Sequence, residues 1–286
     1  MVHRGSLLHP LRAASGEMEV KMKRKGFSTQ TIVFGAFLVT IAFLLGGGFQ
    51  RVTGIPTSIK LNFGGASQSI GFTAVPLVIA SLVLGPFGGL IVAALYDTLQ
   101  YLLITGGVWN PIFTLSEIVV GWLPGIIYLG FKKVNLTRSI RRELVAFLVA
   151  YGLAVILMTS VMGQGQSEAQ RVVQMISFEN GFHIVNGILL GAFLLAIVLS
   201  IGLMFFFSRK RSTEGLFSFD KIYLVTFLAM ILRSLISGYG LWLYMGKTVP
   251  LIFYWLPRFV TPMFLVPIVS FAITGLGYIL KRYTHD

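Results

Sequence analysis

The sequence predicts an all-α membrane protein that crosses the bilayer eight times, and two observations carry that prediction. Hydrophobic residues make up 55% of the 286 residues, and charged residues make up only 12%. Seventeen of the 23 Lys and Arg residues fall in four clusters, at residues 1–29, 132–142, 209–221 and 281–282. Nearly continuous apolar sequence separates the clusters; the first gap is long enough for four membrane crossings, and each of the other two is long enough for two. The positive-inside rule places the clusters and both termini in the cytoplasm.

The first half of the chain predicts four helices. A basic arm, residues 1–28, precedes one transmembrane domain, residues 29–286, whose first helix covers 29–49. Residues 50–71 are rich in Gly, Ser and Thr, and within them residues 58–63 alternate polar and apolar side chains, as a short strand does. The helix at 72–84 is short for a bilayer, so it must begin earlier or be shielded by its neighbours. Gly85-Pro86 then turns the chain, and further helices cover 87–104 and 114–131.

The second half predicts four more helices, again from apolar runs between charged loops. They cover residues 143–162, 182–207, 221–245 and 253–280. An even number of crossings agrees with the charge bias at every cytoplasmic loop. The longest loops have only about 20 residues, too few to fold as separate domains.

Composition excludes several classes of function. The chain has no cysteine, which rules out disulfides, thiolate metal sites and cysteine nucleophiles. The net charge of +13 comes from residues that flank apolar segments, which favours a membrane surface over nucleic acid. Walker A, His-Glu-x-x-His and Gly-x-Ser-x-Gly motifs are absent. We therefore expect no catalytic residues, no resident metal and no cofactor.

Few titratable residues are expected at membrane depth. Asp97 lies near the middle of the third expected helix and Arg233 at comparable depth in the seventh. A charge at the bilayer centre costs about 3 kcal/mol or more unless it is paired. The two residues, or one of them with backbone and hydroxyl groups, are expected to form a structural polar contact; a direct role in ligand binding or coupling is the alternative.

Other polar and aromatic residues gather at the predicted outer ends of the helices. Gln100 shares a helical face with Asp97. Glu117 begins the expected fourth helix, where a carboxylate suits the positive end of the helix dipole. Arg258 follows Pro257 at the outer start of the last helix, either snorkelling to the interface or anchoring an anionic substrate. Three tryptophans form either an interfacial belt or a set of stacking surfaces for a flat ring: Trp109, Trp242 and Trp255.

Several short motifs, taken in order, resemble the substrate-binding S components of energy-coupling factor (ECF) vitamin transporters, and among these the folate branch. The motifs of the first half are Phe72-Thr73-Ala74-Val75-Pro76-Leu77, Leu84-Gly85-Pro86-Phe87-Gly88-Gly89, Asp97, Asn110-Pro111-x-Phe113-Thr114-Leu115 and Gly121-x-x-Pro124-Gly125. The C-terminal motifs are Leu241-Trp242-Leu243, Pro257-Arg258-Phe259 and Pro267.

The resemblance implies a six-helix bundle that captures a vitamin, folate or a related heterocycle, at the outer face of a prokaryotic cell membrane. It also implies a partner coupling subunit in the membrane and two cytoplasmic ATPases. The coupling subunit would contact small residues of the first helix, at Gly35, Ala36 and Thr40. The outer polar and aromatic positions expected to bind substrate are Lys60, Asn62, Gln100, Trp109, Asn110, Phe113, Trp242 and Arg258.

The chain departs from the family pattern in two places. Residues 138–212 add a helix pair to the usual six, and Tyr239-Gly240 replaces an Asn-Thr pair that often precedes the Leu-Trp-Leu stretch. Two other functions stay open. The chain could be a stand-alone proton-coupled carrier of a small organic solute that uses Asp97, or an intramembrane enzyme, although no paired catalytic groups appear at one depth.

Overall fold

In the computed structural model, a bundle of helices carries one β-hairpin. The described residues are 28–55, 58–63, 66–105, 109–131, 144–154, 191, 194–206, 218–247 and 250–283. The chain divides into two units, Met1–Phe34 and Gly35–Asp286. Only the second unit contains the packing described below.

The elements of the first half follow the expected order. Helix α2 (Thr29–Phe43) continues through a π-helical turn, η1 (Leu44–Gly48), into the short helix α3 (Phe49–Thr53). Strands β1 (Ser58–Phe63) and β2 (Ala66–Gly71) precede α4 (Ala74–Val83) and α5 (Gly85–Gln100). A second π-helical turn, η2 (Tyr101–Thr105), extends α5, and α6 (Pro111–Phe131) follows.

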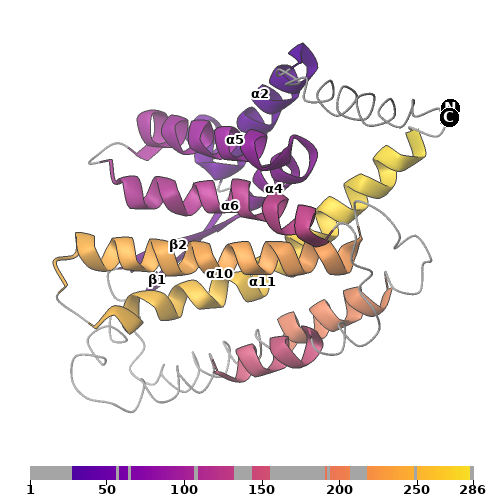
Figure 1. Cartoon of the computed structure of the whole chain (residues 1–286). Helices are drawn as coiled ribbons and strands as arrows, with labels where there is room; N and C mark the ends of the chain where they lie inside the picture. The colour runs from indigo at the N-terminus through magenta and orange to yellow at the C-terminus, as the bar shows by residue number, and fades with distance from the viewer. Residues whose placement is uncertain are drawn as a thin grey trace, which may run out of the picture. The chain divides into compact units, whose positions relative to one another are not determined.

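The second half contributes α10 (Phe219–Tyr244) and α11 (Leu251–Tyr283). Figure 1 shows α5, α6, α10 and α11 lying side by side in that order, and the packed pairs are α5 with α6, α6 with α10, and α10 with α11. The short α4 packs against both α5 and α6. Helix α6 is therefore the central element of the bundle, with neighbours from both halves of the chain.

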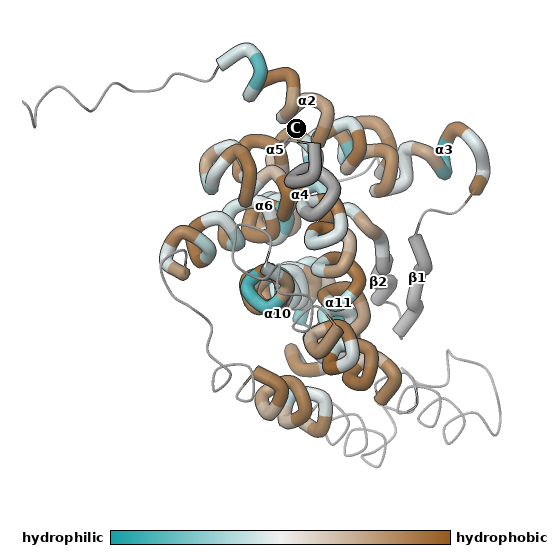
Figure 2. Tube along the Cα trace, turned by 90° about the vertical axis from the view of Figure 1, so that its right-hand side faces the viewer, coloured by the Kyte–Doolittle hydropathy of each residue, from teal (hydrophilic) through white to brown (hydrophobic). Residues whose placement is uncertain are grey.

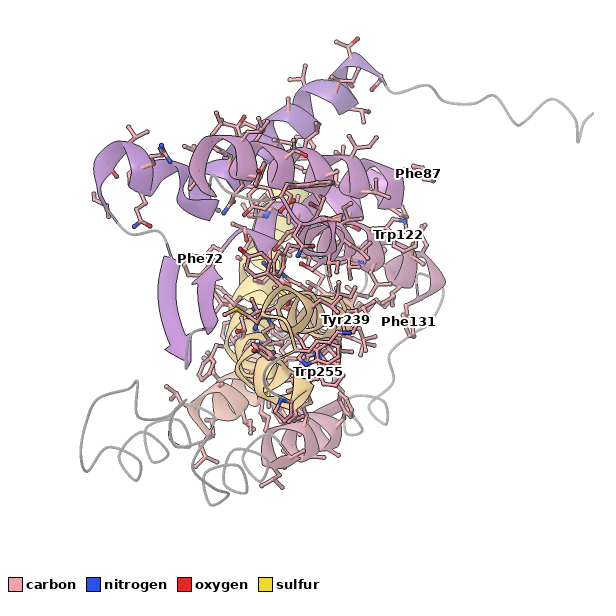
Figure 3. The ribbon with its side chains drawn as sticks, turned by 90° about the vertical axis from the view of Figure 1, so that its left-hand side faces the viewer. Phe72, Phe87, Trp122, Phe131, Tyr239 and Trp255 are labelled. Atoms are coloured by element: carbon pink, nitrogen blue, oxygen red, sulfur yellow. The ribbon has the colours of Figure 1, made fainter. Side chains whose placement is uncertain are left out.

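The long helices turn apolar side chains outward, as a membrane protein must. Four of the described helices are long and apolar enough to cross a bilayer: Thr29–Thr53, Gly85–Ile104, Pro111–Phe131 and Phe219–Tyr244. On α5, Phe87, Ile91 and Leu95 recur every four residues and are all exposed. Figure 2 shows apolar residues covering the helices, and Figure 3 shows Phe87 and Trp122 projecting away from the bundle. These features confirm the predicted all-α polytopic membrane protein.

The short helix α4 is shielded by its neighbours. Its ten residues span only about 15 Å, half a bilayer core. Ala74, Leu77 and Val78 are completely buried, so the helix lies inside the bundle and does not need to reach both membrane faces. Gly85 ends α4 with a φ of 83°, a backbone conformation that glycine adopts without strain.

The β-hairpin lies in the segment expected to be a polar loop. The predicted strand at 58–63 is confirmed as β1, which pairs antiparallel with β2 from Ser58↔Gly71 to Phe63↔Ala66. We did not predict the second strand. The signal that could have found it is the pair Gly64-Gly65 between two short runs, a composition that favours two-residue hairpin turns.

Two helices within the predicted insertion, residues 138–212, pack on α10 and α11. Their described parts are Leu144–Ala154 and Leu194–Phe206, and the rest of the predicted pair lies outside the described residues. The Tyr151 hydroxyl donates to the Phe259 carbonyl at 3.0 Å. The Tyr223 hydroxyl contacts the Ser200 hydroxyl at 3.1 Å. Aromatic edge-to-face packing of Tyr151 on Phe227, at 5.3 Å between ring centroids, adds to this interface.

Helices α5 and α6 cross where both lack side chains. A Cβ added to Gly89 would lie 1.8 Å from the Gly121 carbonyl oxygen, and one added to Gly121 would lie 2.4 Å from the Gly89 oxygen. Small residues allow such backbone contact, which is a common way to pack helices in membranes. Because real Cβ atoms cannot approach an oxygen so closely, any larger residue must force the two helices apart.

Ser81 of α4 hydrogen-bonds to the backbone of α6 next to a proline. Pro124 lies inside α6 and has no N–H to donate, so the helix cannot form its regular hydrogen bonds there. The Ser81 hydroxyl accepts the Gly125 N–H at 2.7 Å and lies 3.3 Å from the Trp122 carbonyl oxygen. Ser81 thereby supplies hydrogen-bonding partners to backbone groups on both sides of Pro124, in an apolar environment where such groups need partners.

We expect Gly121→Ala to destabilise the bundle by about 1–3 kcal/mol, because the added methyl group overpacks the crossing. Gly130→Ala is the matched control on the same helix, since a Cβ there meets nothing within 4 Å. Unfolding of both variants in detergent, followed by thermal denaturation, measures the difference. Equal stability of the two variants would contradict the proposed close contact.

Candidate functional site

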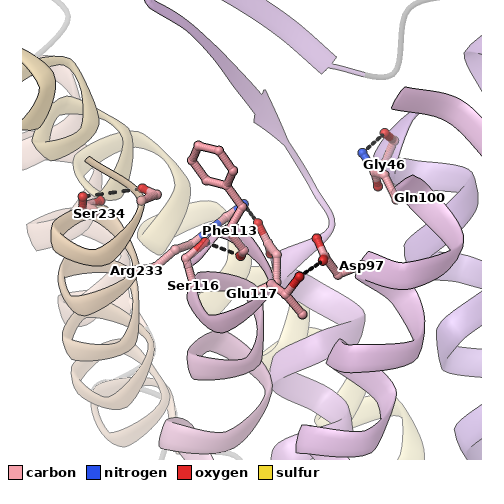
Figure 4. A network of polar contacts seen from close by, with 10 residues as sticks. Gly46, Asp97, Gln100, Phe113, Ser116, Glu117, Arg233 and Ser234 are labelled. Carbon is pink, nitrogen blue, oxygen red and sulfur yellow. Dashed lines mark hydrogen bonds and ion pairs between the residues drawn. The ribbon is translucent and has the colours of Figure 1, made fainter. Parts of the chain in front are cut away.

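Polar side chains gather between α5, α6, α10 and α11, in the half of the bundle where α5 ends and α6 begins. Figure 4 shows this network, which includes Asp97, Glu117 and Arg233. Ionisable residues inside a membrane protein are rare and face the bundle interior or a cavity, so each one is a candidate functional residue. Among the described residues, no group of three His, Asp or Glu side chains could hold a metal ion.

Glu117 of α6 and Arg233 of α10 form an ion pair. The Arg233 Nη2 donates to the Glu117 Oε1, and only 14% of the Glu117 side chain is exposed. The second carboxylate oxygen, Oε2, is buried without a hydrogen-bond partner among the described residues. Glu117 therefore neutralises the arginine while one of its oxygens keeps free acceptor capacity.

This pairing differs from the expectation that Glu117 serves the helix dipole. Helix α6 begins at Pro111, three residues earlier than predicted, so Glu117 lies in its second turn. The first turn is capped instead by Asn110, whose Oδ1 accepts the Ile112 N–H at 3.0 Å. An asparagine cap followed by proline at the first helical position is a strong start signal. Asn110, expected to bind substrate, uses this oxygen for the cap.

Asp97 of α5 is held by a hydroxyl from α6. The Thr114 hydroxyl donates to the Asp97 Oδ2 at 2.6 Å, and the Thr114 Oγ1 accepts the indole N–H of Trp109 at 3.0 Å. Asp97 is thus connected to a residue that precedes α6 by way of one threonine. The partner of Arg233 is Glu117, and the hydroxyl partner of Asp97 is Thr114.

Arg258 lies deeper in the bundle than the sequence suggested. Helix α11 begins at Leu251, so Arg258 is in its second turn, and only 5% of the residue is exposed. Its Nη1 donates to the Tyr254 carbonyl at 3.0 Å, while its Nε is buried with no partner in the described part of the chain. The Ser234 hydroxyl donates to the Arg258 carbonyl at 2.9 Å. Ser234, the residue after Arg233, therefore connects Arg258 to the helix that carries the Arg233–Glu117 ion pair.

Two side chains hold the end of the first helix against the end of α5: Gln100 of α5 bonds to η1, and Arg51 of α3 bonds to η2. The Gln100 side-chain N–H donates to the Gly46 carbonyl at 2.8 Å, and Arg51 donates to the Ile104 carbonyl at 3.0 Å. A Cβ at Gly46 would lie 2.3 Å from the Gln100 Oε1, so glycine is required for this approach. Gln100, expected to bind substrate, is engaged in holding η1 against α5.

Aromatic residues surround the ends of α6, α10 and α11. Trp242 lies 5.8 Å from Tyr239 between ring centroids, and the Lys247 ammonium sits 5.2 Å above the Trp242 ring. Phe113 lies next to α10, because a Cβ at Gly240 would approach its ring to 3.6 Å. Trp255 is turned inward, and its indole N–H donates to the Leu235 carbonyl at 3.0 Å. Trp255 and Tyr239 are both labelled in Figure 3.

The remaining predicted site residues lie on β1 and α2. Lys60 and Asn62 are on β1, paired with Ser69 and Ser67 of β2. On α2, Gly35 is buried, and a Cβ there would contact Leu84 and Val92. Ala36 and Thr40 are exposed, and the Thr40 hydroxyl donates to the Ala36 carbonyl at 2.9 Å. Of the three predicted contact positions, only Ala36 and Thr40 are therefore exposed.

Sequence reasoning missed two features of this candidate site, the contact of Thr114 with Asp97 and the inward pairing of Glu117. Thr114 enters the sequence analysis only as part of the motif Asn110-Pro111-x-Phe113-Thr114-Leu115. A usable signal existed in both cases. Thr114 and Glu117 are three residues apart on one helical face, and a threonine and a carboxylate on an otherwise apolar face need polar partners on neighbouring helices.

Breaking the ion pair should destabilise the protein. Arg233→Met leaves the Glu117 carboxylate unpaired, which for a buried pair costs up to about 3–5 kcal/mol. The double variant Arg233→Met/Glu117→Gln removes both charges and should recover most of the loss. Unfolding of the wild type, both single variants and the double variant in detergent completes the cycle. Additive losses would show that the two side chains do not interact.

Comparison with known proteins identifies a family. A family model described as "ECF-type riboflavin transporter, S component" matches residues 26–200, more than half of the 286-residue chain. The match includes α2 to α6 and ends before α10 and α11. No curated protein and no solved structure matched the chain. The family model names riboflavin where the motifs suggested the folate branch. The chain belongs to the S components, the substrate-binding membrane subunits of ECF transporters.

Proposed function

We propose that this S component captures a flat heterocyclic vitamin, with riboflavin as the first candidate. The observation that carries the proposal is the partly buried polar network between α5, α6 and α10, built on Asp97, Glu117 and Arg233. Charged groups are expensive at membrane depth, and such residues mark substrate paths and binding sites. The family description supports riboflavin as the ligand.

The site we propose combines aromatic faces with a few polar atoms, the usual composition of a small-molecule pocket. Trp109, Phe113 and Trp242 would stack on the ring system. The Arg258 Nε and the Glu117 Oε2, a donor and an acceptor buried without described partners, would hydrogen-bond to the ring edge. A cyclic imide such as that of riboflavin presents acceptors and a donor side by side, so it matches both atoms.

Folate is the second candidate, and Arg258 is the observation that favours it. Arg258 is buried, and no carboxylate pairs with it among the described residues. A ligand carboxylate would compensate this charge by charge-assisted hydrogen bonds. Lys60 of β1 would assist from the hairpin. Riboflavin carries no carboxylate, so the two candidates make different demands on Arg258.

We further propose that the basic clusters face the cytoplasm of a prokaryotic cell, which places the β-hairpin outside. Uptake then requires a membrane-embedded coupling subunit and two ATPases from other chains, since the sequence contains no Walker A motif. Ala36 and Thr40 are the proposed contact with the coupling subunit. A proton-coupled carrier that uses Asp97 is the competing function.

Titration of the purified protein with riboflavin and with folate separates the two candidate vitamins. We expect the fluorescence of riboflavin to be quenched on stacking against tryptophan, and folate not to displace it. If folate binds instead, Arg258→Ala should weaken that binding roughly 30-fold or more, because losing a buried charged hydrogen bond costs about 2–5 kcal/mol. Lys221→Ala, at the opposite end of α10, is the control. Binding of neither vitamin would refute the proposal.

Partner dependence gives a second test. Ala36→Leu should disrupt assembly with the coupling subunit, because the larger side chain blocks close helix approach. Phe37→Leu is the control, since this exposed neighbour gains no bulk. Co-purification of the subunits measures assembly, and vitamin titration should show unchanged affinity. Vigorous uptake by this chain alone in proteoliposomes would favour the carrier.

A further inference from the structure

The contact between Trp109, Thr114 and Asp97 has a feature that an interfacial tryptophan does not need. Trp109 is 51% exposed, and an indole N–H at a membrane surface can bond to water or lipid headgroups. Here the indole N–H donates inward to the Thr114 hydroxyl at 3.0 Å. That hydroxyl donates in turn to the Asp97 carboxylate at 2.6 Å. A partly buried carboxylate on α5 thus holds an exposed ring.

The chemistry of the three groups permits only one direction for these bonds. An indole only donates, a carboxylate only accepts, and a hydroxyl has a single proton and two lone pairs. The Thr114 proton must therefore point to Asp97, which leaves its lone pair for Trp109. Because Asp97, Thr114 and Trp109 come from α5, α6 and the segment before α6, the chain fixes one ring orientation relative to two packed helices.

We propose that Asp97 and Thr114 are positioning residues that set the Trp109 ring as a preformed stacking face for the vitamin. The inference rests on the proposed function, because it names how that site recognises a flat ring. A ring fixed before binding loses less conformational freedom when the ligand arrives, which strengthens binding without any new contact.

Thr114→Val tests the relay, because valine keeps the shape of threonine and removes the hydroxyl. We expect vitamin binding to weaken roughly three- to tenfold, the effect of ordering one side chain on binding. Thr114→Ser should restore it, since serine supplies the same donor and lone pairs. Thr98→Val is the matched control on α5, because the Thr98 hydroxyl donates within its own helix, to the Ala94 carbonyl.

A second variant keeps the test valid if Thr114→Val fails to fold. Trp109→Phe retains an aromatic ring but loses the N–H, so it should weaken binding as Thr114→Val does. The double variant should be no weaker than either single variant, because both remove the same restraint. Additive losses would show that the two residues act separately.

Fluorine NMR of protein labelled with 5-fluorotryptophan reports the ring itself. The Trp109 resonance, identified by its loss in Trp109→Phe, should shift or broaden in Thr114→Val and not in Thr98→Val. An unchanged resonance would refute the positioning role. A changed resonance with unchanged riboflavin and folate affinity would refute the stacking face. If the wild type binds neither vitamin, the proposed function fails along with the stacking face, and the resonance still decides whether Thr114 orients Trp109.

Discussion

The backbone contact between Gly89 and Gly121 determines where the polar groups of this protein meet. It brings α5 and α6 together at a point where both helices lack side chains, and so fixes their register. Asp97 lies eight residues after Gly89, and Thr114 lies seven residues before Gly121. In antiparallel helices with a rise of about 1.5 Å per residue, those offsets place the two side chains at nearly the same height. Their hydrogen bond is a consequence of the crossing.

Helix α6 carries this register to the second half of the chain. Its Glu117 pairs with Arg233 of α10, and the next residue of α10, Ser234, bonds to the carbonyl of Arg258 on α11. Each contact joins one helix to the next across the bundle. A shift at one crossing would therefore alter polar contacts on three interfaces, which explains how a site assembled from four helices can have a defined shape.

The sequence predicted the helices well because apolar runs and charged loops are local signals. The alternating pattern that predicted the strand at 58–63 is an equally local signal. The contact partners of the charged residues were not predictable, since Asp97, Glu117 and Arg233 lie on different helices and their contacts depend on helix register. Glu117 was placed in the first turn of its helix because α6 was predicted to start at residue 114 instead of Pro111. Arg258 was expected at the outer start of the last helix, but the packing of α11 against its neighbours buries it.

The sequence likewise predicted the protein family but not the ligand within that family. Ordered motifs such as Leu84-Gly85-Pro86 indicated an ECF S component, and the family match agrees. The glycines and prolines in these motifs serve the packing of the bundle, as Gly89, Gly121 and Pro124 show. Such residues report the fold that S components share. They carry little information on which vitamin fits, because their role in the bundle is to let backbones approach.

The hydrogen bond from Ser81 to the backbone of α6 makes the evolution of position 81 depend on that of position 124. With Pro124 present, a residue at 81 that lacks a hydroxyl removes the hydrogen bond that the Gly125 N–H makes to the Ser81 hydroxyl. With an ordinary residue at 124, α6 can form its own hydrogen bonds and the hydroxyl becomes dispensable. Loss of the proline must therefore precede loss of the serine for each step to remain neutral. In a set of related sequences, the two positions should vary together and in that order.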